Sequence, residues 1–237
     1  MQDILEKIEK INWQDIALNM HEKGYALVPD FLPPSQCAAL IDQYDQEEAY
    51  RKTVTMERHR FGLGQYKYYT YPLPPLIQNL RQSLYAKLAP MANAWVKCLN
   101  IDKYFPKYFE DFQAECHTHH QDKPTPLILK YTKGGFNTLH QDLYGEVYFP
   151  LQAAFFLNEP EKDYTGGEFI LTEQVPRAQS KAIVLKPGKG SMLIFTTNFR
   201  PVKSARGYTR ATMKHGVSEV HGGKRHIMGV IFHDAVN

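Results

Sequence analysis

The feature of this sequence that most restricts its fold is a succession of short strand-like segments in its second half. From residue 127 onward, runs rich in β-branched and aromatic residues alternate with turns made of Gly, Pro or charged residues. These runs occupy residues 127–131, 147–157, 168–172, 181–186, 190–196, 208–217 and 225–233. Segments of this length and spacing predict a curled pair of sheets rather than a helical bundle.

The first half of the chain carries mostly helical patterns. Residues 3–20 place isoleucines at helical spacing, and residues 24–32 are predicted to form a strand that runs into a turn. Two further helices are expected at 76–88 and 92–99, separated at Pro90 because proline cannot donate a helical hydrogen bond. We therefore expect an α+β fold that is mainly β, with N-terminal helices supporting the sheets.

Length and composition limit the classes of protein to which this chain can belong. The 237 residues suffice for one large domain with a substantial core. The formal net charge of +3 permits an anionic partner without requiring one. No run approaches the roughly 18 apolar residues of a membrane span, and the charged N-terminus lacks the apolar core of a signal peptide. Cys37, Cys98 and Cys116 show no paired spacing, so we expect free thiols and a cytoplasmic location.

Two histidines and one aspartate are the candidate metal ligands. His140 and Asp142 follow a strand-like run and a Gly134-Gly135 turn, and His215 lies in a later strand-like run. Two imidazoles and one carboxylate suit a non-haem Fe(II) ion that keeps other coordination positions open. A site of this kind belongs at the rim of packed strands, where its ligands are held rigidly.

A second motif has the same letters, His120-Gln-Asp122, and is the alternative ligand pair. It lies in a polar run that ends before Pro124-Thr-Pro126 and is predicted to be a loop. We therefore prefer His140 and Asp142 as the metal pair. The neighbouring imidazoles of His117, His119 and His120 are expected to be solvated loop side chains, and His221, His226 and His233 to be structural.

Arg225 is the candidate anchor for a co-substrate. It lies ten residues after His215, in a segment that alternates like a strand. A guanidinium presents two parallel N–H groups to a carboxylate, so it suits one end of a small diacid.

The segment 51–71 is the candidate substrate lid. It interleaves basic residues with tyrosines, which suits stacked bases and phosphates, but alternating Tyr is also ordinary β-hairpin chemistry. From it we take Arg58 and Tyr66 as candidate substrate contacts, together with Tyr144 and Glu146 after the metal pair. A further basic cluster approaches His215 and either grips phosphates or is a solvated strand edge: Arg200, Lys203, Arg206, Arg210 and Lys214.

Several motifs together resemble the 2-oxoglutarate/Fe(II)-dependent dioxygenase superfamily. They are Tyr131-x-x-Gly134 before His140-x-Asp142, the run 166–170 (Gly-Gly-Glu-Phe-Ile), the run 187–195, and His215-Gly-Val217 with Arg225. In that superfamily the fold is a double-stranded β-helix, or jelly roll. The resemblance implies one oxygenase domain over 1–237, with a helical lead-in and substrate lid in 1–125 and the jelly-roll catalytic core in 126–237.

The same resemblance implies the cofactors. It assigns Fe(II) to His140, Asp142 and His215, and 2-oxoglutarate to Arg225 with help from Tyr131, nine residues before His140. Ascorbate is expected to help such an enzyme in vitro. The implied reaction uses O₂ to hydroxylate a C–H bond and releases succinate and CO₂.

The substrate class stays open at this level. Residues 140–146, 165–174 and 226–235 are similar to an uncharacterised bacterial family proposed to demethylate alkylated nucleic acid. His140-Gln-Asp142 resembles AlkB-type demethylases, whereas the short spacing from His215 to Arg225 resembles prolyl hydroxylases. The first candidate is therefore demethylation of DNA or RNA bases, and the second is hydroxylation of a protein side chain or small molecule. The third is a non-enzymatic, cupin-like metal-binding module.

Overall fold

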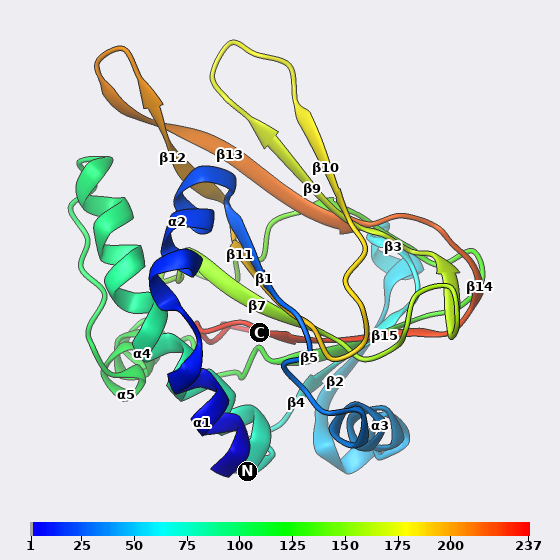
Figure 1. Ribbon diagram of the computed structural model, residues 1–237. Helices are drawn as coiled ribbons and strands as arrows, with labels where there is room; N and C mark the ends of the chain where they lie inside the picture. Colours follow the sequence, from blue (N-terminus) through cyan, green and yellow to red (C-terminus); the bar gives the residue numbers. More distant parts are fainter. Residues whose placement is uncertain (1) are drawn as a thin grey trace.

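Two β-sheets carry most of the computed structural model, which describes residues 2–237 (Figure 1). Every pairing between their strands is antiparallel. The seven-stranded sheet has the order β1 (Tyr25–Val28), β11 (Met192–Thr196), β7 (Leu151–Phe156), β15 (Arg225–Val230), β5 (Leu127–Tyr131), β4 (Gln65–Tyr69) and β2 (Tyr50–Thr55). The six-stranded sheet has the order β10 (Lys181–Leu185), β9 (Phe169–Gln174), β13 (Gly207–Val217), β6 (Phe136–His140) and β3 (Gly62–Leu63), with β12 (Phe199–Ser204) paired to β13. A separate pair consists of β14 (Val220–Gly223) and β8 (Tyr164–Gly166).

The helices cover one face of the seven-stranded sheet. They are α1 (Gln2–Lys10), α2 (Trp13–Lys23), α3 (Pro34–Asp42), α4 (Pro75–Cys98) and α5 (Phe109–Thr118), with short 3₁₀ turns at Gln43–Asp45, Glu47–Ala49 and Met56–His59. Alternate residues of β11 face opposite ways: Met192 and Ile194 join the core beneath the helices, while Leu193 and Phe195 join the core between the sheets. Because both faces are covered, β11 is buried throughout.

Helix α4 corrects one expectation, since it continues through Pro90 instead of breaking there. The helix buries Leu84, Leu88, Met91 and Trp95, on both sides of the proline, in one hydrophobic core. Proline in a helix interior costs about 3 kcal/mol. Burial of these four large side chains, at about 1.5–3 kcal/mol each, outweighs that cost.

The strand predictions are largely confirmed, and the misses have identifiable causes. β5, β7, β9, β10, β11, β13 and β15 fall on the seven predicted runs, although β7 begins at Leu151 rather than 147. β6 was not predicted because its residues are exposed or half-buried and show no apolar alternation. β12 contains Pro201, which local patterns exclude from a strand interior, but it lies on the sheet edge.

The N-terminal half is less purely helical than expected. Its segment 51–71 forms the β2–β4 hairpin, and β4 continues the large sheet by pairing with β5. β1 closes the other edge of that sheet against β11. The lead-in therefore shares its sheet with the second half of the chain.

The cysteine expectation is confirmed, because Cys37, Cys98 and Cys116 are all free. Within residues 2–237, no helix combines the length and apolarity that crossing a bilayer would require.

Two buried histidines should make the folded state less stable at acidic pH. Burial lowers the pKa of His226 to about 4, and burial likewise lowers the pKa of His233 to about 4. The unfolded chain, with ordinary histidine pKa values near 6.5, therefore binds more protons than the folded one between these limits. Stability should be full above pH 6.5 and fall toward pH 4, by about 2 kcal/mol per histidine at pH 5. Urea unfolding at pH 7 and pH 5 measures this loss, and His226→Gln should remove about half of it.

Candidate metal centre

The structure brings His140, Asp142 and His215 together between the two sheets. His140 ends β6 and is the direct cross-strand neighbour of His215 on β13. Asp142 follows two residues after His140, and its carboxylate oxygens lie 3.2 Å from Nε2 of His215 and 3.5 Å from Nε2 of His140. Donor atoms of the three residues all lie within 4.8 Å of one another, so one ion can contact all of them.

The electrostatics of Asp142 and His215 favour metal ligation, whereas the burial of His140 is outweighed by Asp142, which raises the pKa of His140. Burial works against an ionised Asp142, but His215 and His140 outweigh it and hold the pKa of the Asp142 carboxyl well below its usual value. Burial and the neighbouring His140 lower the pKa of His215, against the attraction of Asp142. An ionised carboxylate and an imidazole kept neutral are the forms in which these side chains bind a metal.

Two hydrogen bonds orient the donors. Nδ1 of His140 lies 2.8 Å from the carbonyl oxygen of Thr138 and donates to it, which leaves the lone pair on Nε2, toward Asp142. The Tyr144 hydroxyl donates to Oδ1 of Asp142 at 2.7 Å. Tyr144 was expected to contact the substrate, and the structure shows its hydroxyl fixing the Asp142 carboxylate.

Tyr144→Phe is expected to weaken Fe(II) binding by about 10-fold, because outer hydrogen bonds to a ligating carboxylate typically account for 10–100-fold in metal affinity. The ring and its packing are retained in this variant, so the fold should be unchanged. Competition with a chromophoric chelator measures the affinity. Equal Fe(II) affinity in the variant and the wild type would show that this hydroxyl does not position Asp142.

Two cavities meet at His140 and Asp142, and His215 lines the smaller of them. The smaller encloses about 60 Å³ between the sheets, where apolar side chains such as Leu129, Phe169 and Ile227 surround it. The larger encloses about 170 Å³ and extends toward the β2–β4 hairpin. Its walls are largely aromatic or apolar: Met56, Phe61, Tyr66, Leu127, Leu129 and Tyr144. His140, Asp142 and Asn137 line both cavities.

Arg225 lies next to residues that line the smaller cavity, although it does not line the cavity itself. On β15, Arg225, Ile227 and Gly229 alternate on one face, and the latter two line the cavity. Arg225 is the cross-strand neighbour of Tyr131, which also lines it. The guanidinium carbon lies 5.5 Å from the Tyr131 ring centre and 5.7 Å from the Tyr164 ring centre. Tyr131 therefore lines the same cavity as the three donors, and Arg225 lies beside Tyr131.

The residues present fit both expected cofactors. Arg225 is 1% exposed, and among residues 2–237 none accepts a hydrogen bond from its guanidinium nitrogens. The buried Tyr131 hydroxyl likewise lacks a protein partner within the described chain. A buried cation without a partner is costly, and one carboxylate of a diacid would satisfy both groups. The His-Asp-His set is the matching ligand set for Fe(II).

Gly167 makes room for this arginine. A Cβ atom there would lie 3.0 Å from Cδ of Arg225 and 2.8 Å from a Val220 methyl, and its φ is +62°. Strand β9 begins at Phe169, two residues after Gly167. The turn at Gly167 therefore also packs directly against the Arg225 side chain.

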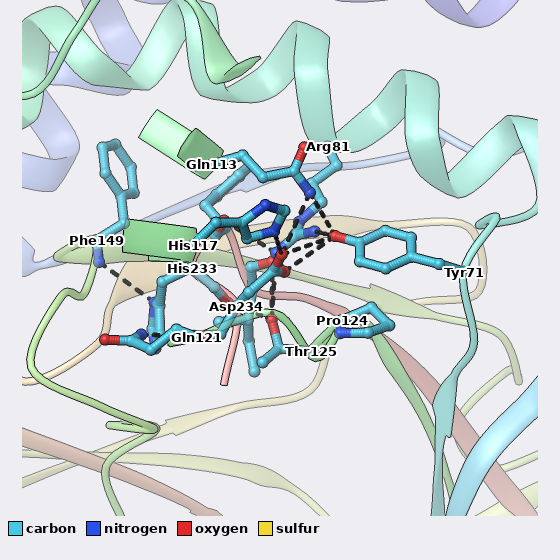
Figure 2. A network of polar contacts seen from close by, with 12 residues as sticks. Tyr71, Arg81, Gln113, His117, Gln121, Pro124, Thr125, Phe149, His233 and Asp234 are labelled. Atoms are coloured by element: carbon cyan, nitrogen blue, oxygen red, sulfur yellow. Dashed lines mark hydrogen bonds and ion pairs between the residues drawn. The ribbon is translucent and has the colours of Figure 1, made fainter. Parts of the chain in front are cut away.

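A buried polar network joins helix α4 to the C-terminal segment around Asp234 (Figure 2). Arg81 of α4 pairs with Asp234 at 2.7 Å and donates to the Ile231 carbonyl oxygen, and Tyr71 also donates to Asp234. Gln121 then bridges the C-terminal segment to the loop by donating to the carbonyl oxygens of Asp234 and Val147. These contacts hold residues 141–149 against a rigid layer.

The remaining candidates lie in different surroundings. Tyr66 lines the larger cavity, whereas Arg58 is exposed on the 3₁₀ turn after β2 and does not line it. Glu146 is exposed, faces His119 at 3.4 Å and lines neither cavity. His117 corrects the loop expectation: it lies in α5, with Nε2 at 3.2 Å from the buried Asp234 carboxylate.

Sequence reasoning missed two polar groups at the site. Gln152 lines the smaller cavity, is 3% exposed, and its amide nitrogen has no partner within residues 2–237. The signal for it was a polar residue inside the apolar run 147–157. The Arg81–Asp234 pair joins residues 153 positions apart, and no local sequence pattern predicts a pairing over that distance.

Such a donor set, with a buried, unpartnered arginine beside the Tyr131 that lines the same cavity, is the chemistry of a 2-oxoglutarate-dependent Fe(II) dioxygenase. The chain belongs to an oxygenase family, described as "oxygenase, catalysing oxidative methylation of damaged DNA", which matches residues 64–235. Two uncharacterised proteins of Mycobacterium tuberculosis, from strains CDC 1551 / Oshkosh and ATCC 25618 / H37Rv, are 46% identical over 164 residues, covering 69% of this chain and 70% of each relative. This membership rules out the non-enzymatic metal module.

Solved structures show the same fold at low sequence identity. A Pseudomonas putida prolyl-4-hydroxylase has a TM-score of 0.56 and 13% identity, covering 94% of this chain and 100% of that one. A Trichoplax adhaerens prolyl hydroxylase, in complex with a hypoxia inducible factor peptide fragment, has a TM-score of 0.56 and 12% identity, covering 99% and 93%. A 2OG-Fe(II) oxygenase family member from Burkholderia pseudomallei has a TM-score of 0.52 and 14% identity, covering 96% and 94%.

Proposed function

We propose that this oxygenase removes methyl groups from alkylated DNA or RNA bases. The observation that carries the proposal is the larger cavity, which opens at the metal donors and has the rings of Phe61, Tyr66 and Tyr144 in its walls. Aromatic walls suit a flat base, and Asn137, Thr138 and Gln141 provide polar groups for its edges. The family to which the chain belongs, with its stated connection to damaged DNA, supports the same substrate class.

Each part of the site has a distinct task in this proposal. His140, Asp142 and His215 hold Fe(II), and Arg225 with Tyr131 holds the distal carboxylate of 2-oxoglutarate. The bound cofactors supply an oxidant that inserts oxygen into a C–H bond. The apolar lining of the smaller cavity excludes water from the co-substrate, which strengthens the charge pairing at Arg225.

The chemistry balances as a demethylation. An N-methyl group, O₂ and 2-oxoglutarate give an N-hydroxymethyl group, succinate and CO₂. The C–N bond of the hydroxymethyl group then breaks, the nitrogen keeps a proton, and formaldehyde leaves. The net result removes one methyl group rather than adding one.

The same proposal includes the finer description of the fold. We infer that the two facing sheets constitute a double-stranded β-helix and that residues 1–237 act as a single oxygenase domain. The antiparallel order of the strands and the sheet shared by both halves of the chain support this inference. Three free cysteines support a cytoplasmic location.

Formaldehyde release tests the substrate class. With Fe(II), 2-oxoglutarate and ascorbate, the enzyme should release one formaldehyde per methyl group lost from single-stranded oligonucleotides carrying N-methylated bases. Unmethylated oligonucleotides of the same sequence are the control and should release none. Turnover of 2-oxoglutarate without formaldehyde from any methylated base would contradict the proposal.

A second candidate is hydroxylation of a protein side chain. The short His215-to-Arg225 spacing and the fold shared with prolyl hydroxylases favour it. A proline-containing peptide that gains 16 mass units without formaldehyde release would establish this alternative.

A further inference from the structure

The positive charge of the chain is concentrated in one stretch. Residues 174–218 contain no Asp or Glu and hold nine of the 28 Lys and Arg residues. The rest of the chain is left with 19 basic and 25 acidic residues, a net charge of −6. A chain with a modest overall charge of +3 therefore carries one strongly basic region.

This region forms two hairpins that project beyond the body of the two sheets, β9–β10 and β12–β13 (Figure 1). Six of its basic side chains on these hairpins are exposed: Arg177, Lys181, Lys203, Arg206, Arg210 and Lys214. Within the described residues 2–237, none of the six makes an ion pair. Lys186 and Arg200 are paired, with Glu161 and Glu173 respectively.

Few carboxylates face the hairpins. Glu173 is buried and held by Arg200, and Glu22 of α2 lines the hollow at the hairpin bases beside Lys181. The charges nearer the tips stand without a carboxylate partner in the described chain. Like charges gathered without counter-charges raise the free energy of the surface, and a polyanion relieves that cost.

The register places several of these groups on one face of the β12–β13 hairpin. Lys203 is directly opposite Tyr208, so the two share a face. Arg210 and Lys214 lie two and six residues after Tyr208 on β13, on the same face. The intervening residues Ala211 and Met213 are buried, so they point the other way. The exposed side chains therefore lie on the face of β13 opposite the one that carries His215.

Aromatic rings lie among these cations. Tyr208 is 40% exposed, and the guanidinium carbon of Arg210 lies 5.2 Å from the Phe199 ring centre. An exposed ring between cations suits unstacked bases joined by phosphates, whereas a paired duplex offers no free base faces at its surface.

We propose that the exposed face of the β12–β13 hairpin, with the neighbouring β9–β10 tip, binds the phosphate backbone of single-stranded nucleic acid outside the active site. This docking surface rests on the proposed function for its biological meaning. The same sheet continues from β13 to β6 and β3, where Thr138 and the adjacent Phe61 line the larger cavity. The docking face is the face of that sheet opposite the one that carries His215, so a bound strand reaches the metal by passing around the sheet edge at β3, where Phe61 lines the larger cavity.

Fluorescence anisotropy with an unmethylated single-stranded oligonucleotide tests the docking surface without turnover. The probe needs neither Fe(II) nor 2-oxoglutarate. A triple variant, Lys203→Ala, Arg206→Ala and Arg210→Ala, should bind at least about 10-fold more weakly than wild type. The slope of log affinity against log salt should fall by about 2, at roughly 0.7 per lost phosphate contact. Tyr208→Ala should weaken binding while leaving that slope unchanged.

The matched control removes the same charge elsewhere, by Lys97→Ala, Lys107→Ala and Lys162→Ala, all at exposed positions. Its salt slope should match that of the wild type. Equal loss in both triple variants, tighter binding of a duplex, or binding only to anionic vesicles would each overturn the docking surface. Intact hairpin-dependent binding without formaldehyde release would instead contradict the demethylation proposal alone.

Discussion

His215→Ala is expected to abolish 2-oxoglutarate turnover and to weaken Fe(II) binding by more than about 100-fold. Mutating a residue that only hydrogen-bonds a metal ligand typically lowers metal affinity by up to about 100-fold. His215 is itself one of the three predicted ligands, so its loss should lower the affinity by more. The variant leaves Asp142 with His140 as its remaining imidazole neighbour, so one ion can no longer contact three donors. Metal content after dialysis and succinate formation measure the two effects.

His221→Ala is the control for this variant. It removes an exposed imidazole six residues away, on β14, and should change neither iron binding nor turnover. Normal iron content in His215→Ala would contradict the assignment of the metal centre.

Arg225→Met is expected to raise the KM for 2-oxoglutarate on the order of 100-fold. Truncating one partner of a buried, hydrogen-bonded charge pair costs about 2–5 kcal/mol, and 1.4 kcal/mol is a factor of ten. Fe(II) binding should persist, because Arg225 contacts none of the three donors through a hydrogen bond or ion pair in residues 2–237. Steady-state kinetics and iron content separate the two functions.

Arg225→Lys refines the test. Lysine keeps the charge but presents a single ammonium in place of the two-pronged fork, so its KM should lie between those of wild type and Arg225→Met. The rise in melting temperature caused by 2-oxoglutarate should shrink in the same order. An unchanged KM in Arg225→Met would show that the distal carboxylate binds elsewhere.

The sequence predicted both strands that carry Tyr131 and Arg225, and the family resemblance implied that the two residues act together. Their pairing as cross-strand neighbours of β5 and β15 is a matter of register, which the uneven burial of β5 and the full burial of β15 do not reveal as a period of two. The choice between His120 and His140 followed from context: His140 ends a strand of the central sheet, whereas His120 lies after α5 with a φ of +61°.

The features that the sequence did not reveal depend on contacts between residues far apart in the chain. The Arg81–Asp234 pair and the two bonds of Gln121 exist only once α4, α5 and the C-terminal segment pack together. The continuation of α4 through Pro90 likewise depends on the hydrophobic core beneath it, because local propensity alone ends the helix there.

The three metal donors share a cavity with Tyr131, and Arg225 beside Tyr131 is the proposed binding group for the distal carboxylate of the co-substrate. Anaerobic titration of the protein with Fe(II) and 2-oxoglutarate tests this arrangement most directly, through the visible charge-transfer absorption of the chelate. We expect this band in wild type, its loss in His215→Ala, and its appearance in Arg225→Met only at much higher 2-oxoglutarate concentrations. Absence of the band in iron-loaded wild type would contradict the account.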